Sequence, residues 1–323
     1  MLVRTITFIA LAFASFSPVS AAAVAVDRAH VEAHENFLAG DALKGRGSAT
    51  SDEAIAAAYV ASQFQAFGLR PPPGWASFLQ TAPVPSTDRT RKLGLAKNAR
   101  TTNAVGFLPG TDPAAGILLI SAHLDHLGDV GGEVFHGAND NASGTTAVLE
   151  LARVLAASGS HKRSIMFACY GAEELGLIGS SYFGSHAPVP LRDIVANIEF
   201  EMVGAPDPQF ASGSLMMTGF DRSTLGPTLR ARGALIMPDP YPEEKFFERS
   251  DNYSLALEGV VAHTISGWAT IPTLHTTADT VANIDFAFMT RAIQSLVEPV
   301  TWLADGDFRP QWTGEGAPSK VKP

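Results

Sequence analysis

Two short apolar segments with a helical segment between them place the strongest constraint on the fold of this chain. Residues 117–121 (ILLIS) and 165–169 (IMFAC) have the length and composition of strands that are buried on both faces. Residues 146–157 lie between them and place apolar side chains on one face of a helix. Because a strand–helix–strand unit pairs its strands in parallel, the chain is predicted to be an α/β protein with helices on both faces of a sheet.

Other segments extend this alternation over most of the 323 residues. Ser51 or Asp52 can cap a helix that Gly68 ends. Hydrophobic residues make up 46% of the chain, which is enough for a sizeable core, and a single domain over 27–306 is expected. The further expected elements are a helix over 52–67, strands over 197–202 and 260–265, and a long helix over 285–303.

The two ends of the chain are predicted to lie outside this domain. Residues 1–21 have the features of a signal peptide: a basic Arg4, an apolar run over 6–16 that is too short to span a bilayer, and small residues after Pro18. We therefore expect an exported protein, periplasmic or secreted, with no integral membrane segment in the mature chain. Residues 307–323 are rich in Pro, Gly and Lys and are expected to form a flexible tail.

Charge and cysteine content exclude two kinds of site. The formal net charge is −9, and nucleic-acid binding, which needs clustered positive charge, is not expected. Cys169 is the single cysteine, so the chain can form neither an intramolecular disulfide nor a cysteine-cluster metal site. Its place within an apolar segment indicates a buried packing thiol.

Acids and histidines gather where the expected strands end. His123 follows the first apolar strand, and Glu173 and Glu174 follow the second. Between them, residues 137–144 (GANDNASG) form a tight turn that carries Asp140 and opens a helix. Ligands of open α/β sheets bind beyond the carboxyl ends of the strands, and imidazole together with carboxylate suits zinc. The sequence therefore predicts a zinc site at this edge.

Six motifs follow one another along the chain: HLD (123–125), GANDNASG (137–144), GAEELGLIGS (171–180), EMVG (201–204), RSDN (249–252) and LHTTADT (274–280). Together they resemble the motifs of the co-catalytic dizinc exopeptidases, a family that includes bacterial leucyl aminopeptidases, aminopeptidase Y, glutamate carboxypeptidase and the glutaminyl cyclases. The resemblance spans about residues 33–304 and implies a three-layer αβα fold with a central mixed, largely parallel sheet.

The resemblance implies two zinc ions and a role for each ligand. His123 and Glu201 would hold one zinc, Glu174 and His275 would hold the other, and Asp140 would bridge both. Glu173 would be the general base. Glu199, two residues before Glu201 on the same strand face, is the less favoured alternative ligand because the sequence Met-Val-Gly that fits the family follows Glu201.

Supporting residues follow from the same resemblance and from general metal-site chemistry. Asp125 is expected to accept the second ring N–H of His123 and so set its tautomer, and Asp279 is expected to serve His275 similarly. The resemblance also implies a cis peptide bond between Asp140 and Asn141.

Two groups of residues depart from the family pattern or lie outside it. Leu274 stands where some members place a tyrosine as oxyanion donor, so Tyr253, Tyr241 or the second zinc would have to take that part. His126 and His136 are interpreted as side chains that line the pocket. The remaining histidines are interpreted as structural: His30, His34, His161, His186 and His263.

The function expected from these features is that of an exported zinc aminopeptidase that acts on peptide substrates. A glutaminyl cyclase-type acyltransferase with one zinc is the first alternative, and carboxypeptidase or dipeptidase activity within the same family is the second. A metal-free binding module is disfavoured because the chain keeps the whole ligand set.

Overall fold

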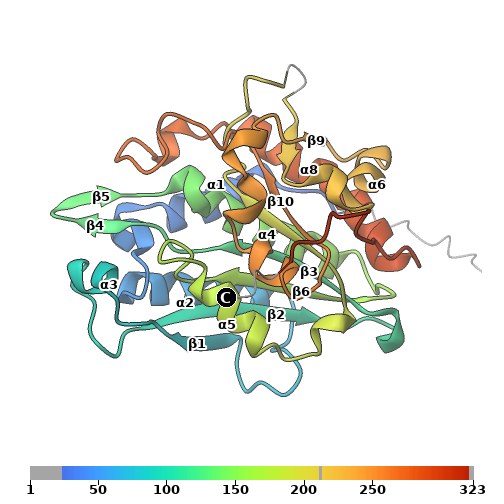
Figure 1. Cartoon of the computed structure of the whole chain (residues 1–323), viewed down its shortest axis with the longest axis horizontal. Helices are drawn as coiled ribbons and strands as arrows, with labels where there is room; N and C mark the ends of the chain where they lie inside the picture. Colours follow the sequence, from blue (N-terminus) through green and yellow to red (C-terminus); the bar gives the residue numbers. More distant parts are fainter. Residues whose placement is uncertain (1–23, 211–212, 320–323) are drawn as a thin grey trace, which may run out of the picture.

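The computed structural model describes residues 24–210 and 213–319 as one α/β unit built around an eight-stranded sheet (Figure 1). The predicted signal peptide, residues 1–21, lies outside the described residues. The strand order is β1-β2-β6-β3-β7-β10-β8-β9. The strands span Leu79–Pro83 (β1), Arg100–Leu108 (β2), Ile117–His123 (β3), Ser164–Tyr170 (β6), Ile194–Glu201 (β7), Leu215–Met217 (β8), Ile236–Pro238 (β9) and Ala262–Ser266 (β10).

The centre of the sheet is parallel, and antiparallel strands adjoin it on both sides. Strand β3 pairs in parallel with β6 and β7, and β7 pairs in parallel with β10. Strands β1 and β2 are antiparallel to their neighbours, and β8 is antiparallel to β10. The predicted three-layer fold with a mixed, largely parallel sheet is therefore confirmed. A separate two-stranded hairpin is formed by Gly128–Val130 (β4) and Glu133–Phe135 (β5).

Helices cover both faces of the sheet because the buried strands are apolar on both sides. Along β3, Leu118 and Ile120 belong to one core cluster, whereas Leu119 belongs to the other. Each fully buried side chain of this size contributes about 1.5–3 kcal/mol. The first cluster lies under α1 (Arg28–Leu38), α2 (Ser51–Ala66), α4 (Ser143–Ala157) and α8 (Phe286–Asp305), and the second under α5 (Ile178–Ser185) and α7 (Asn252–Ala256). Two short helices complete the fold, α3 (Asp88–Lys92) and α6 (Leu225–Ala231).

Local capping explains where the predicted helices begin. Thr50, rather than Ser51 or Asp52, caps α2 by accepting the main-chain N–H groups of Asp52 and Glu53. Asp285 caps α8 by accepting the N–H of Phe288. Helix α4 begins three residues before the predicted start, directly after the turn that carries Asp140. Strands β1, β8 and β9 were not predicted because short strands carry a weak hydrophobic pattern, and the nine-residue β2 was not predicted because it begins with the polar residues RTTN.

The parallel centre brings four strand ends to one edge of the sheet. His123 is the last residue of β3, Glu201 the last of β7 and Ser266 the last of β10. Glu173 and Glu174 follow the end of β6 by three and four residues. Because parallel strands end on the same side, residues far apart in the sequence meet here.

Residues 307–319, which belong to the segment expected to form a flexible tail, contact other parts of the chain in the structure. Trp312 forms an isolated bridge with Ser223, and its ring packs 5.3 Å from that of His263. Arg309 donates to the main-chain oxygen of Ala115 at 2.8 Å. Composition alone predicted fraying, but one tryptophan and one arginine attach residues 307–319 to the body. In the described ranges, no helix combines the length and apolar composition needed to cross a membrane.

Candidate metal centre

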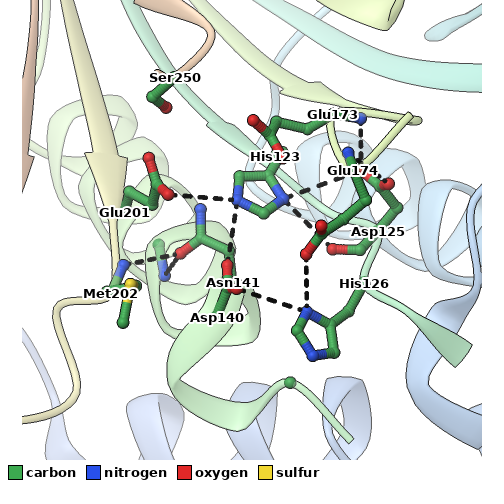
Figure 2. Close-up of polar contacts among 12 residues, drawn as sticks. His123, Asp125, His126, Asp140, Asn141, Glu173, Glu174, Glu201, Met202 and Ser250 are labelled. Carbon is green, nitrogen blue, oxygen red and sulfur yellow. Dashed lines mark hydrogen bonds and ion pairs between the residues drawn. The ribbon is translucent and has the colours of Figure 1, made fainter. Parts of the chain in front are cut away.

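Six acidic and histidine side chains converge at the carboxyl edge of the sheet in two groups that share one residue. Figure 2 labels all of them except His275. The first group is His123, Asp140 and Glu201. The second group is His126, Asp140, Glu174 and His275. Within each group, the potential ligand atoms lie within 4.8 Å of one another. The structure thus brings together all five residues that the resemblance implied as ligands and adds His126.

Asp140 faces both groups with different oxygen atoms. Its Oδ1 lies 3.3 Å from Nε2 of His123, and its Oδ2 lies 3.1 Å from Nε2 of His275. The carboxylate is nearly buried, with 4% of the side chain exposed. An arrangement with one oxygen toward each group suits a carboxylate that bridges two metal ions.

The turn that carries Asp140 is held against the end of β7. The Asp140–Asn141 peptide bond is cis, as expected. The side chain of Asn141 donates to the main-chain oxygen of Phe200 at 2.9 Å and accepts the N–H of Met202 at 3.1 Å. These bonds place the bridging carboxylate beside Glu201.

Several buried polar atoms in the two groups have no hydrogen-bond partner among the described residues. They include Nε2 of His123, both ring nitrogens of His126 and Oε1 of Glu174. Leaving a buried polar atom unsatisfied costs about 1–3 kcal/mol. Convergent imidazole and carboxylate atoms without protein partners are the donor set that a zinc ion satisfies, so the residues fit zinc.

Mutual contacts favour the charged forms of Asp140, Glu174 and His275, whereas burial raises the pKa of the Glu201 carboxyl. Burial and Asp140 oppose the ionisation of Glu174, but the imidazoles of His126 and His275 lower the pKa of Glu174 to about 2. The carboxylates of Asp140 and Glu174 raise the pKa of His275 to about 10. Burial opposes the ionisation of Asp140 too, yet His123 and His275 hold its pKa well below the usual range. The carboxylates of Asp140 and Glu174 are therefore ionised, as metal binding requires, whereas His275 must release its ring proton to bind a metal ion.

Glu173 lies next to the second group without belonging to it. It lines the same cavity as Glu174 and Glu201. Burial raises the pKa of Glu173 well above its usual range, His123 opposes this shift, and the nearby carboxylate of Glu201 adds to it. A carboxylate with a raised pKa beside a metal site is suited to accept and return a proton.

Asp125 supports the site differently from the prediction. The ring Nδ1 of His123 is bonded to the main-chain oxygen of Asp125 at 3.2 Å, whereas the Asp125 carboxylate is 3.8 Å away. That carboxylate accepts the main-chain N–H groups of Glu173 at 3.0 Å and Glu174 at 3.3 Å, and the hydroxyl of Ser48 at 2.5 Å. The fully buried Asp125 thus holds the loop after β6 in place.

Asp279 also differs from its predicted part. Its carboxylate accepts the main-chain N–H groups of Asn139 at 2.8 Å and Asp140 at 3.0 Å, so it supports the turn of the bridging residue rather than His275. The carboxylate is thus bound by the main-chain N–H groups of Asn139 and Asp140, which the short spacing between Asp279 and His275 in the sequence does not reveal.

Arg46 is a structural residue of the site that sequence reasoning missed. Its guanidinium is fully buried and donates to four main-chain oxygens. Burial lowers the pKa of Arg46, and neighbouring acids, of which Glu35 is the strongest, oppose this shift. The bonds join the segment before α2 to three other parts of the chain. The acceptor oxygens are those of Leu38 at the end of α1, Leu124 directly after His123, and His136 and Gly137 at the start of the turn that carries Asp140.

The alternative ligand and the alternative oxyanion donors lie elsewhere. Glu199 accepts the hydroxyl groups of Ser250 and Thr264 and belongs to neither ligand group. Tyr241 donates to Asp207 at 3.0 Å, and neither Tyr241 nor Tyr253 lines the cavity. The proposal of a tyrosine donor is therefore not supported by the geometry.

A cavity of about 370 Å³ opens onto the two groups. Its floor contains Asp140, Glu173, Glu174 and Glu201, and Phe246 and Leu274 contribute apolar walls. Ser266 also lines it and pairs with Glu201 in the β7–β10 register. The Oγ of Ser266 is buried and has no hydrogen-bond partner within the described ranges.

The fold and the site define a class of α/β proteins with two candidate groups of metal ligands at the carboxyl edge of a mixed sheet. The model of "Peptidase family M28" matches residues 103–299, more than half of the chain, and this range contains both ligand groups. The chain belongs to this peptidase family.

Curated relatives resemble part of this chain. "Leupeptin-inactivating enzyme 1" of Streptomyces exfoliatus is 36% identical over 110 residues, which are 33% of this chain and 24% of that protein. "Aminopeptidase YwaD" of Bacillus subtilis is 38% identical over 119 residues, 36% of this chain and 25% of that protein. The matches thus span about a quarter of these relatives' own length.

A solved structure resembles nearly the whole fold. The zinc aminopeptidase BSAP from Bacillus subtilis superposes with a TM-score of 0.64 over 87% of this chain and 98% of that chain. The sequence identity is 18%, so this likeness establishes the fold alone.

Proposed function

We propose that this protein is a zinc aminopeptidase that removes N-terminal residues from peptides. The observation that carries the proposal is Asp140, which presents one oxygen to each of two histidines while Glu173 lies beside the shared site. Membership of the peptidase family and relatives named as aminopeptidases support it. We also propose export, on the basis of residues 1–21 alone.

The ligands proposed are the five residues that the family resemblance implied. His123, Glu201 and Asp140 would hold one zinc, and Asp140, Glu174 and His275 the other. When bound, two zinc ions would polarise the scissile carbonyl and lower the pKa of a shared water.

The protein residues would manage the proton and the substrate. Glu173 takes a proton from the water whose oxygen forms the new bond to the carbonyl carbon. It then returns that proton to the amine nitrogen as the carbon–nitrogen bond breaks. Asp125 keeps Glu173 in position through the main-chain N–H groups that it accepts. Ser266, whose Oγ has no hydrogen-bond partner in the described ranges, would donate to the substrate's carbonyl oxygen, since no tyrosine lines this cavity.

A one-zinc glutaminyl cyclase is the weaker candidate. Two ligand groups that share Asp140 favour two metal ions, and a cyclase of that type needs one. Metal content measured on the purified protein separates the two: two zinc ions per chain support hydrolysis, and a single tight zinc with cyclising activity contradicts it.

The experiment that tests the proposed function is a substrate panel on the full chain. Aminoacyl p-nitroanilides and free peptides are incubated with untreated, chelator-treated and zinc-restored protein, alongside N-terminally blocked peptides. The expected result is release of the N-terminal residue that is lost with chelation, regained with zinc and absent for blocked peptides. Hydrolysis of blocked peptides alone would indicate a carboxypeptidase instead.

A further inference from the structure

The loop after β3 carries a buried histidine to which the proposed function gives no part. His126 follows His123 by three residues, and its side chain is fully buried. Its main-chain N–H donates to the oxygen of Arg46 at 3.2 Å, and its main-chain oxygen accepts the N–H of Ser48 at 3.3 Å. A Cβ added at Gly137 would lie 2.4 Å from Cγ of His126, so the ring packs tightly against this glycine. The imidazole is thus fixed in direction.

We propose that His126 is a direct ligand, through Nδ1, of the zinc held by Glu174 and His275, so that this metal position has four protein ligands. The inference rests on the proposed metal centre, but not on the peptidase activity. It adds a ligand to the five that the family resemblance implied.

The distances from the two imidazoles to the shared carboxylates are alike. Nδ1 of His126 lies 3.0 Å from Oε1 of Glu174 and 3.6 Å from Oδ2 of Asp140. Nε2 of His275 lies 3.2 Å and 3.1 Å from the same two oxygens. Zinc–ligand bonds of about 2.0–2.1 Å in a tetrahedron put neighbouring ligand atoms about 3.3 Å apart. Four of the six distances among these atoms are therefore close to the edge of a zinc tetrahedron, and all four atoms lie within 4.8 Å of one another.

The contact between His126 and Glu174 does not have the geometry of a hydrogen bond. Although the two atoms are 3.0 Å apart, neither Nδ1 of His126 nor Oε1 of Glu174 has a hydrogen-bond partner in the part of the chain that the structure describes. A histidine that only supported a ligand would direct its N–H at the carboxylate. Figure 2 shows the ring of His126 with one nitrogen facing both Glu174 and Asp140, as a common ligand centre requires.

A fourth protein ligand would change this metal position. Three protein ligands leave a position open for water or substrate, whereas four close a tetrahedral site unless the metal expands its coordination. The metal at Glu174, His275 and His126 is therefore expected to be the more tightly held of the two. The metal at His123 and Glu201 keeps the more open coordination.

Metal binding by the apo form of the full chain tests this directly. Zinc is titrated into chelator-treated protein in competition with a chromophoric chelator, for the wild type, His126→Asn and His126→Ala. Asparagine places an amide N–H near the position of Nδ1 but is a poor zinc ligand. We expect two sites in the wild type and a loss of at least about 100-fold in the affinity of one site in both variants, beyond the range of supporting residues.

His136→Asn is the matched control, because His136 belongs to neither ligand group and is expected to leave both affinities unchanged. If His126→Asn binds both zinc ions as the wild type does, the inference is overturned and His126 is a hydrogen-bond donor. If the wild type binds no zinc, the proposed function fails as well, so the two failures are distinguishable.

X-ray absorption of the zinc-loaded wild type decides the question even if the variants do not fold. We expect the spectrum to give three imidazole ligands in total for the two zinc ions, from His123, His275 and His126. A total of two imidazole ligands for the two zinc ions would contradict the proposal.

Discussion

The carboxylate of Asp125 accepts the main-chain N–H of Glu173 at 3.0 Å. The same carboxylate holds the N–H of Glu174, so one buried acid sets the direction of both the proposed base and a proposed ligand. The main chain of Asp125 contacts His123 as well. This single residue therefore connects the segments that follow β3 and β6.

Replacing Glu173 should abolish turnover and leave the metals in place. Glu173→Gln removes the group that accepts the proton but keeps the size of the side chain, so kcat should fall at least about 100-fold. Zinc content by elemental analysis should stay at the wild-type level. Glu248→Gln, which changes another acid of the same cavity, is the control and should keep activity. Near-normal turnover of Glu173→Gln would refute the general-base role.

Asp125→Asn should lower kcat by about 10–100-fold, as is typical of residues that orient a metal site. The amide has a single acceptor oxygen and cannot serve the N–H groups of Glu173 and Glu174 as well as the hydroxyl of Ser48. Because the base is reoriented, the pH profile of kcat should shift, which a change in stability alone would not cause. Asp129→Asn, an exposed acid nearby, is the control. An unchanged pH profile would count against the positioning role.

Arg46→Met should destabilise the fold by at least about 3 kcal/mol, because four buried main-chain oxygens lose their donor. Urea unfolding of the full chain measures this. Arg28→Met, which alters an exposed ion pair with Glu32, should change stability by less than about 0.5 kcal/mol. Equal effects of the two substitutions would show that Arg46 does not hold the loops.

Ser266→Ala should lower kcat by about 100-fold with little change in KM, because an oxyanion donor acts mainly in the transition state. Ser181→Ala, at an exposed position, is the control. A rise in KM at constant kcat would assign Ser266 to substrate binding instead.

The protein without metal should lose stability as the pH falls from about 6.5 to about 4. Burial lowers the pKa of His34 to about 4, so the unfolded chain takes up protons first and acid favours unfolding. At pH 5 the His34 contribution amounts to about 2 kcal/mol relative to pH 7.5. His34→Leu should therefore show a shallower decline in urea unfolding between these pH values. His186→Leu, which removes an exposed imidazole, should show the same loss of unfolding free energy at acid pH as the wild type. The same loss in His34→Leu would exclude protonation of His34 as the cause.

The ligand types and their order could be predicted because their signals are local. A buried strand shows as an apolar run, and a turn that opens a helix shows as glycine, asparagine and aspartate at fixed places. His123, Asp140 and Glu174 lie within or directly after such segments. Since parallel strands end at one edge, their proximity could also be inferred.

Which acids support which ligands was decided only by the tertiary structure. Asp125 and Asp279 were expected to serve histidine rings, but each accepts main-chain N–H groups instead. Those donors come from segments nearly 50 and 140 residues away, a pairing that depends on strand order and loop path.

The sequence by itself determined the fold class, the zinc-type donor set and the edge where it gathers, because hydrophobic period and turn chemistry act over a few residues. Only the tertiary structure decided that His126 joins the second group, that Arg46 holds the surrounding loops and that residues 307–319 pack on the body. Each of these depends on a buried side chain meeting partners from distant segments, and burial of that kind exists only after the layers have assembled.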